Sequence, residues 1–175
     1  MGKRTISFDL STKSIEAAIR ELNEYKREFQ AKVDLYRKRV AEEIATIAQS
    51  TFNRSIVDDV IKGGTSRKAS VTVTVQHGGN ISVVVADGED AVWCEFGAGV
   101  YHNTPVGSSP NPYGSDLGLT IGSYGKGYGK GQAWGYYDES GELIITRGTP
   151  ATMPMYNSAQ EVARKAIEIA REVFG

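Results

Sequence analysis

Few residues in this chain are suited to nucleophilic or metal chemistry. There is one cysteine, Cys94, and there are two histidines, His77 and His102. A nucleophilic cysteine needs a neighbouring base, and a metal site needs three or four converging ligands. Cys94 lies between Trp93 and Glu95 in an apolar segment, where a lone cysteine is usually a small core residue. We therefore expect no enzyme and no metal or cofactor site, and we expect an unreactive Cys94 thiol in the folded protein.

A second candidate chemistry is phosphate binding by the glycine-rich stretch near residue 126. A P-loop has the sequence G-x-x-x-x-G-K-[ST]. The tripeptide Gly125-Lys126-Gly127 lacks the hydroxyl residue after the lysine and the glycine five positions before Gly125. No G-x-G-x-x-G sequence lies between a strand pattern and a helix pattern either. The sequence therefore fits neither of these nucleotide-binding motifs.

The same stretch interleaves aromatic and basic residues, a composition that suits single-stranded nucleic acid. Tyr124 and Tyr128 could stack on bases while Lys126 and Lys130 contact phosphates. Asp116 reduces the net charge of the loop to about +1, and the whole chain has a net charge of -1, so the cation excess that favours polyanion binding is missing. We favour a loop whose tyrosines provide contact area for a protein partner. A single-strand nucleic-acid-binding module is the alternative, and a Cys94-dependent enzyme is a third, weaker hypothesis.

The composition describes an average globular chain with one unusual segment. The 175 residues suit a single domain, residues 1–175. No run approaches the ~18 apolar residues that a membrane span needs, and no secretory signal follows the basic start, so we expect no membrane association. Ten of the 20 glycines lie between Gly97 and Gly131. We expect a long glycine-rich loop over residues 98–133, where function is concentrated.

The first element that must position this loop is a long N-terminal helix. Residues 11–53 contain no proline or glycine, and their apolar residues recur in steps of three, four or seven. An unbroken helix would be about 60 Å long, which exceeds the width of a compact domain of this size. We expect the helix either to break in the polar stretch 23–28 or to project and pack on a neighbouring subunit.

The remaining elements follow from alternation and turn residues. Residues 70–97 predict a β-hairpin that turns at residues 77–80, followed by a segment, 91–96, that fits either a third strand or a short helix. Residues 53–69 have no periodicity and are expected to be a connector. Residues 134–175 predict a second strand pair and an amphipathic C-terminal helix from Met155 to Phe174. The expected class is α+β, with both long helices packed on one face of a small antiparallel sheet.

Three features in this order resemble a known family. They are the long N-terminal helix that ends in Ala45–Phe52, the segment Ala91–Gly99 (AVWCEFGAG) after the hairpin, and the segment Gly148–Met155 (GTPATMPM) before the final helix. The chain resembles the tail-component family of long-tailed bacteriophages, which includes head–tail joining, neck and tail-completion proteins. The resemblance covers about residues 5–53, 70–100 and 133–174.

The resemblance implies a structural virion protein without catalytic activity. Such a protein works as a homo-oligomeric ring, hexameric or similar, between the head connector and the tail-tube or tail-terminator proteins. It is found in the virion and, during assembly, in the host cytoplasm, and it meets DNA only as DNA passes through the channel.

We expect the interface residues of such a ring to lie mainly in the loop. The candidates are Tyr101, His102, Tyr113, Tyr124, Lys126, Tyr128, Lys130 and Trp134. Either of two roles is compatible with their placement, because the loop could line the channel or contact a partner protein.

Overall fold

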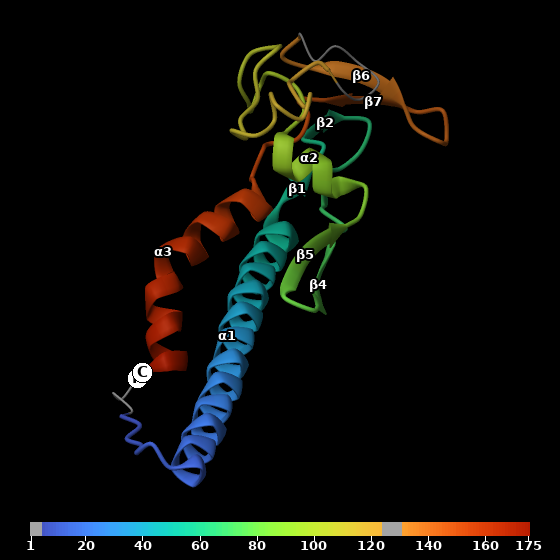
Figure 1. Cartoon of the computed structure of the whole chain (residues 1–175). Helices are drawn as coiled ribbons and strands as arrows, with labels where there is room; N and C mark the ends of the chain where they lie inside the picture. Colours follow the sequence, from blue (N-terminus) through green and yellow to red (C-terminus); the bar gives the residue numbers. More distant parts are fainter. Residues whose placement is uncertain (1–4, 124–130) are drawn as a thin grey trace.

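A computed structural model describes residues 5–123 and 131–175 of the chain (Figure 1). The elements, in chain order, are α1 (Thr12–Arg54), β1 (Ile56–Val57), β2 (Val60–Lys62), β3 (Arg67–Lys68), β4 (Thr72–Gly78), β5 (Ile81–Asp87), α2 (Asp90–Phe96), β6 (Trp134–Tyr137), β7 (Leu143–Thr146) and α3 (Pro154–Phe174). Long helices and small antiparallel sheets make this an α+β fold, as the sequence predicts.

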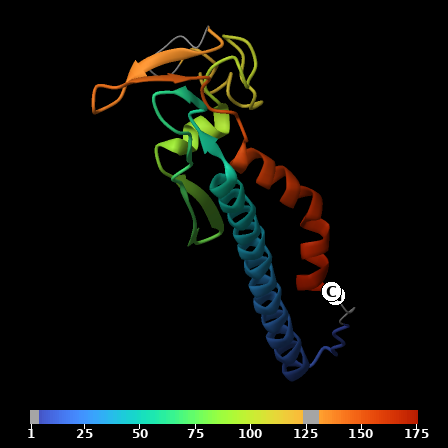
Figure 2. The same cartoon turned by 180° about the vertical axis from the view of Figure 1, so that it is seen from behind.

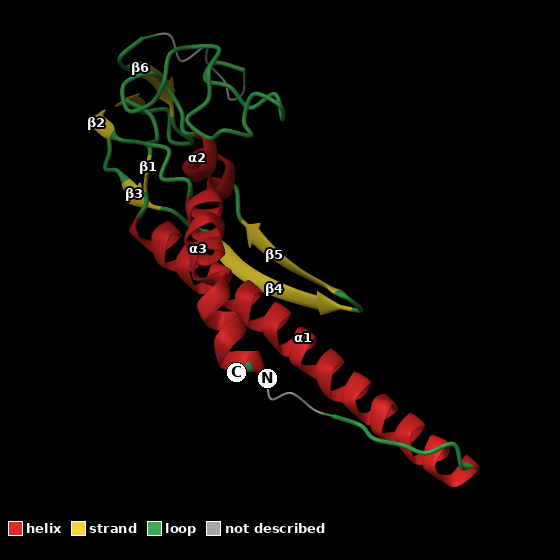
Figure 3. Ribbon diagram, turned by 60° about the vertical axis from the view of Figure 1, so that its left-hand side comes forward, coloured by secondary structure: helices red, strands yellow, loops and turns green. Residues whose placement is uncertain are grey.

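Helix α1 is unbroken over its 43 residues and is about 65 Å long. It begins after Ser11, whose hydroxyl oxygen accepts a hydrogen bond from the backbone N–H of Ser14 at 3.3 Å. The break expected at residues 23–28 is wrong, because those residues are polar but include no proline or glycine and are compatible with a helix. The first half of α1 therefore projects well beyond the strands, as Figure 3 shows.

Helix α3 runs beside the second half of α1 (Figure 2). The ring of Phe174 lies 5.9 Å from that of Phe29 and 6.2 Å from that of Tyr36, centroid to centroid. Lys165 Nζ lies 3.5 Å from the Glu43 carboxylate. The apolar face of α3 thus packs against α1.

No helix in the described part of the chain has a segment long and apolar enough to cross a membrane.

The predicted hairpin is confirmed. Strands β4 and β5 pair antiparallel in one continuous register from Thr72↔Asp87 to Gly78↔Ile81, with Gly79 and Asn80 as the turn. The hairpin packs on α1, because alternate residues of each strand face the helix. The second predicted pair, β6–β7, is also confirmed, with Trp134↔Thr146 at one end and Tyr137↔Leu143 at the other.

The strands form three small sheets instead of one. Besides the hairpin there is a β1–β3 pair and a three-stranded sheet in the order β2-β7-β6. The connector expected at residues 53–69 therefore contains three strands of two or three residues each, which are too short to show a periodicity. Residues 91–96, left open by the sequence, belong to helix α2, which ends at Gly97 with φ +74°.

The largest cluster of buried apolar residues lies where α1, the base of the hairpin and α2 meet. Phe52, Val57, Val71 and Cys94 form it. Phe52 and Cys94 have no exposed surface. Burial raises the pKa of the Cys94 thiol to about 11, so the group stays protonated at neutral pH. Cys94 is therefore a packing residue, which agrees with an unreactive thiol.

Replacement of Phe52 by alanine should destabilise the protein strongly. The change removes a fully buried aromatic ring and leaves a cavity, so we expect a loss of about 3–5 kcal/mol in the free energy of unfolding. Phe8, which is mostly exposed, is the matched control, and Phe8→Ala should change the stability of the monomer, measured on dilute protein, by less than about 0.5 kcal/mol. Denaturant unfolding followed by circular dichroism measures both, and equal effects would contradict the assignment of the core.

Candidate functional site

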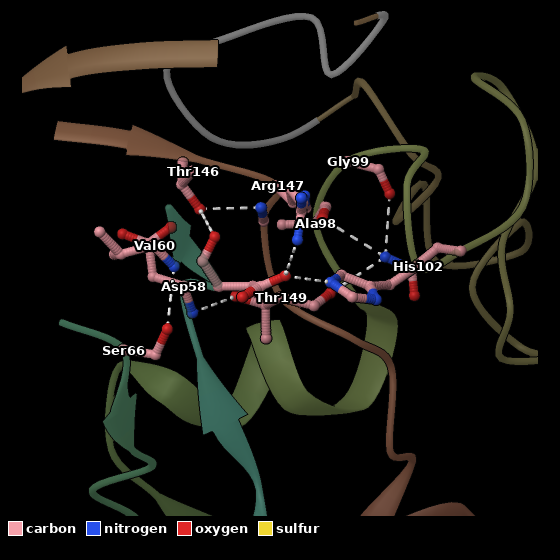
Figure 4. Close-up of polar contacts among 12 residues, drawn as sticks. Asp58, Val60, Ser66, Ala98, Gly99, His102, Thr146, Arg147 and Thr149 are labelled. Carbon is pink, nitrogen blue, oxygen red and sulfur yellow. Dashed lines mark hydrogen bonds and ion pairs between the residues drawn. The ribbon is translucent and has the colours of Figure 1, made fainter. Parts of the chain in front are cut away.

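The structure brings three of the predicted interface residues together. They meet at a junction made of residues 58–59, 98–103 and 147–149, whose polar contacts Figure 4 shows around Asp58, His102 and Thr149. Tyr101 and His102 belong to the junction, and the ring of Trp134 packs against Gly99 and Gly148. Tyr113 instead places its ring against that of Tyr156 of α3, 5.9 Å away between centroids. The other four candidates lie outside the described residues: Tyr124, Lys126, Tyr128 and Lys130.

Charged and aromatic side chains cluster on the outer side of this junction. His102 Nε2 lies 2.9 Å from Asp59 Oδ2, and Arg147 Nη1 lies 3.7 Å from the same oxygen. The Arg147 guanidinium stacks over the Tyr101 ring, 4.7 Å from its centroid, and the Tyr101 and His102 rings meet edge to face. All of these groups are partly exposed, so the cluster is accessible to a partner.

An aspartate that is hydrogen-bonded to a histidine can orient that histidine as a general base, and His102 and Asp59 form such a pair. Among the described residues, no hydroxyl or thiol is hydrogen-bonded to the other ring nitrogen of His102. Cys94 is buried elsewhere, and no group of three or more potential metal ligands occurs in the part of the chain that the structure describes. The arrangement therefore suits a polar contact surface better than acid–base catalysis.

The chain turns sharply between β1 and β2, and this turn is pinned to the segment after β7. Asp58 has φ +62°, and its backbone N–H donates to Thr149 Oγ1 at 3.1 Å. The Asp59 N–H donates to the Gly148 carbonyl at 2.7 Å, and the Arg147 N–H donates to the Asp59 carbonyl at 2.9 Å. These bonds place the Asp59 carboxylate beside Arg147 and His102.

Asn103 is the central connector of the junction. Its side-chain amide donates to the carbonyls of Gly99 at 2.9 Å and Thr149 at 3.0 Å. Its side-chain oxygen accepts the N–H of Ala151 at 2.9 Å. One side chain thus satisfies backbone groups from two segments about fifty residues apart, which leaves little freedom in how they dock.

Trp134 requires glycine at two facing positions. A Cβ on Gly99 would lie 2.3 Å from the Trp134 ring, and one on Gly148 would lie 2.5 Å from it. Both glycines also have positive φ, +78° and +90°. The Trp134 ring can cover the junction only because Gly99 and Gly148 have no side chains. These two glycines therefore have a specific steric role.

A buried carboxylate connects α2 to α3. Glu95 Oε2 accepts the backbone N–H of Met155, and Oε1 accepts those of Tyr156 and the Asn111 side chain, each within 2.9 Å. Met155 and Tyr156 lie in the first turn of α3, where backbone N–H groups have no partner within the helix. Glu95 therefore caps α3 from outside the helix.

The segments Ala91–Gly99 and Gly148–Met155 are in contact. Ala98 and Thr149 exchange two backbone hydrogen bonds, and the N–H groups of Thr152 and Met153 both donate to the Cys94 carbonyl. Together with Glu95, these bonds join AVWCEFGAG and GTPATMPM into one hydrogen-bonded unit. Neither motif alone predicts this contact.

Sequence reasoning missed most of the polar residues that build the junction. Asp59, Asn103, Asn111 and Arg147 carry no local signal, because each bonds a residue at least sixteen positions away. Glu95 does carry one, since it is a charged residue inside the apolar run Ala91–Phe96.

A second surface of interest is the uncovered half of α1. Ile15, Ile19, Leu22 and Phe29 follow each other at helical spacing and form an apolar stripe. Ile19 and Leu22 are 52% and 55% exposed. The same spacing continues through Val33, Tyr36 and Val40, where α3 lies beside the helix. The stripe is therefore the continuation of a face that is packed further along the same helix.

The total surface of the chain is large for its mass. A compact monomer of 19.0 kDa exposes about 8,400 Å², whereas the accessible surface of this chain is 11269 Å². The eleven residues outside the described ranges would contribute about 1,800 Å² even if fully extended. At least about 1,100 Å² of the surplus thus belongs to the described residues.

No protein-family model, curated protein or solved structure matches the chain.

The pH dependence of stability should reveal the buried carboxyl group. Burial raises the pKa of Glu95 above that of an ordinary glutamate, even though its three hydrogen bonds act in the opposite direction. The folded protein then keeps the proton to a higher pH than the unfolded chain does. The contribution of Glu95 to stability is consequently largest at low pH and decreases as pH rises from the ordinary pKa through the raised one.

Glu95→Gln removes this titration. The difference in unfolding free energy between the wild type and Glu95→Gln should shift against the wild type as pH rises through that interval. Denaturant titrations at a series of pH values measure it. A difference that shifts in favour of the wild type with rising pH would mean that hydrogen bonding outweighs burial at this carboxylate.

Proposed function

We propose that this protein is a structural subunit that assembles with copies of itself into a ring and joins the head connector to the tail of a long-tailed bacteriophage. The geometry supports self-assembly, and the resemblance of the three sequence features supplies the phage neck or tail-completion role. The protein then functions in the virion after assembly in the host cytoplasm, and it binds the connector and a tail-tube or tail-terminator protein.

The observation that carries the proposal is the surplus of surface together with the apolar stripe on α1. A stable protein–protein contact buries about 800 Å² on each partner, and a ring subunit makes one such contact on each of two sides. The surplus on the described residues, at least about 1,100 Å², is of this order. The stripe gives it an apolar centre of aliphatic and aromatic side chains, of the kind that self-association buries.

The occupant that fits the apolar stripe is a second copy of the chain. Acidic and basic residues of α1 alternate around the stripe, as in Glu16–Arg20 and Glu28–Lys32, so the surface has no single-sign field that would select a strongly charged partner. A net charge of -1 also keeps the repulsion between many copies small. A stripe on one helix that contacts a different surface of the next copy generates a ring when the rotation closes.

The junction contributes rigidity to this proposal. It fixes α3, the loop after α2 and the β2-β7-β6 sheet to the end of α1, so a contact at Tyr101, His102 or Arg147 is held at a defined distance from the apolar stripe. That polar cluster is our candidate surface for the connector or tail protein. Single-strand nucleic-acid binding stays a sequence-based alternative, since its four key residues lie outside the described part of the chain.

Charges placed in the apolar stripe should weaken assembly. We expect Ile19→Glu/Leu22→Glu to lower the affinity between copies at least about 100-fold, because burying two carboxylates and losing two aliphatic contacts costs more than about 2.7 kcal/mol. The measurement is molar mass by light scattering over a concentration series, alone and with connector or tail-tube protein.

The matched control is Ala17→Glu/Ala31→Glu, which adds the same two charges to exposed positions on the opposite face of α1. This variant should assemble like the wild type. A wild-type chain that stays monomeric at high concentration, with and without connector or tail-tube protein, would refute the proposed function. Salt-sensitive oligonucleotide binding that is lost in Tyr124→Ala/Tyr128→Ala would instead favour the nucleic-acid hypothesis.

A further inference from the structure

The segment before α1 has the sequence of a β-strand but lies in no sheet. Residues 5–10, Thr-Ile-Ser-Phe-Asp-Leu, alternate polar and apolar residues strictly, the pattern of a strand with one buried face. In the structure this arm has no strand partner, and Leu10 is 90% exposed. Asp9 is tied to the start of α1, since it accepts the N–H of Ser11 and its own N–H donates to Ser14 Oγ. The arm therefore has an apolar strand pattern without a strand partner, with Ile6 partly buried and Phe8 and Leu10 exposed.

The outer edge of β5 is a strand edge to which such an arm could pair. The contacts of Gln49 show which backbone groups of the hairpin point outward. The side chain of Gln49 accepts the N–H of Val73 at 2.7 Å and donates to the Val71 carbonyl at 2.9 Å, so it covers the edge of β4 at the base of the hairpin. The N–H of Val73 must therefore point away from β5. Val73 and Ala86 are opposite each other and so form a non-hydrogen-bonded pair. In such a pair the backbone N–H and C=O groups of both residues point away from the partner strand, so those of Ala86 also point outward.

Alternation extends this result along β5. The backbone groups of Ser82, Val84 and Ala86 all face the outer side of the hairpin. Within the described residues, no hydrogen bond is made to any of them. The edge is seven residues long without a bulge, proline or lysine, and it is flanked by the exposed side chains of Ile81 (65%) and Val83. Natural edge strands usually avoid such a surface, because it accepts a further strand.

The arm cannot reach the hairpin of its own chain. The tip of the hairpin lies at Arg37, whose Nη1 donates to the Gly79 carbonyl at 2.6 Å, and its base lies at Gln49. Ser11 and Arg37 are separated by 26 helical residues, which is about 39 Å along α1. The arm from Ser11 back to Thr5 spans at most about 21 Å. The arm and the hairpin can therefore pair only when they belong to different molecules.

We propose that the arm, residues 5–10, of one copy adds as a third strand to the outer edge of β5 in a neighbouring copy. When Thr5 and Ser7 provide the backbone hydrogen bonds to the outward groups of β5, Ile6 and Phe8 fall on the face that also carries Val83. The added strand satisfies the open edge and covers its apolar side chains. The inference rests on the proposed self-assembly and gives that assembly a specific contact.

This contact has a direction, because the arm of one copy meets the hairpin of another. Each copy has one arm and one open edge, so the contact closes either as a dimer whose two copies exchange arms or as a ring in which it passes from copy to copy. The proposed assembly is the ring. The number of copies joined covalently in a cross-linking experiment distinguishes the two.

Engineered disulfides test the proposal in the full-length protein, whose one native cysteine is buried. We would combine Ser7→Cys in turn with Ser82→Cys and with Val84→Cys. Under mild oxidation, at least one pair should give a ladder of three or more copies on a non-reducing gel. The matched control is Ser7→Cys with His77→Cys, which places the second thiol opposite Ser82 but on β4, about 10 Å from the added strand and beyond the ~7 Å reach of a disulfide.

A second measurement leaves the edge intact and changes the arm. Ile6→Ser/Phe8→Ser should raise the dissociation constant between copies at least about tenfold, whereas Ser7→Thr, which keeps the alternation, should leave it unchanged. A wild type that assembles while the arm variants assemble equally well and cross-linking matches the His77 control would overturn the arm contact and leave the proposed ring standing. A wild type that does not assemble at all would overturn both.

Discussion

The carboxylate of Glu95 holds the first turn of α3, and the relative placement of the two long helices depends on that contact. Its oxygens accept the N–H groups of Met155 and Tyr156, while the neighbouring Cys94 carbonyl accepts those of Thr152 and Met153. Helix α2, only seven residues long, thus directs α3 back along α1. The cost of burying the carboxylate is offset only in part by three hydrogen bonds and by the partial positive charge of a helix N-terminus, since the pKa of Glu95 stays raised.

With its direction fixed at one end, α3 covers only part of α1. It ends at Phe174 beside Phe29 and Tyr36, whereas α1 continues for seventeen residues before Phe29. An amphipathic helix normally buries its apolar face, but the apolar face of α1 extends beyond the end of α3, which covers the rest of it. The uncovered part, from Ile15 to Leu22, is the apolar surface that remains available for a second copy. The large accessible surface of the chain has the same cause, since α3 is shorter than α1.

The hairpin, like α1, has a surface that is covered only in part within the chain. Gln49 covers the edge of β4 at the base of the hairpin, whereas no side chain in the described part of the chain bonds the outward backbone groups of β5. Two-stranded sheets are marginal alone, and this one gains stability from α1 beneath it. An arm with strand alternation at the far end of a 65 Å helix completes the sheet of a neighbour and not its own. Because the rigid helix α1 separates the arm from the open edge of β5, the two can pair only between copies, and the contact runs from the arm of one copy to the hairpin of the next.

The sequence by itself determined what depends on neighbours a few residues apart: the helical face of α1, the hairpin with its Gly79-Asn80 turn, the β6–β7 pair and α3 all follow from periodicity and turn residues. It also singled out two of the three segments that form the junction, those that contain Gly99 and Thr149. Tertiary structure decided that α1 is unbroken, that residues 56–68 form three short strands, and that residues 91–96 are helical. It alone joined His102 to Asp59 across 43 residues and Glu95 to Tyr156 across 61. Such contacts leave no local pattern, because hydrogen bonds between distant segments depend on where the whole chain places their atoms and not on the spacing of residues within either segment.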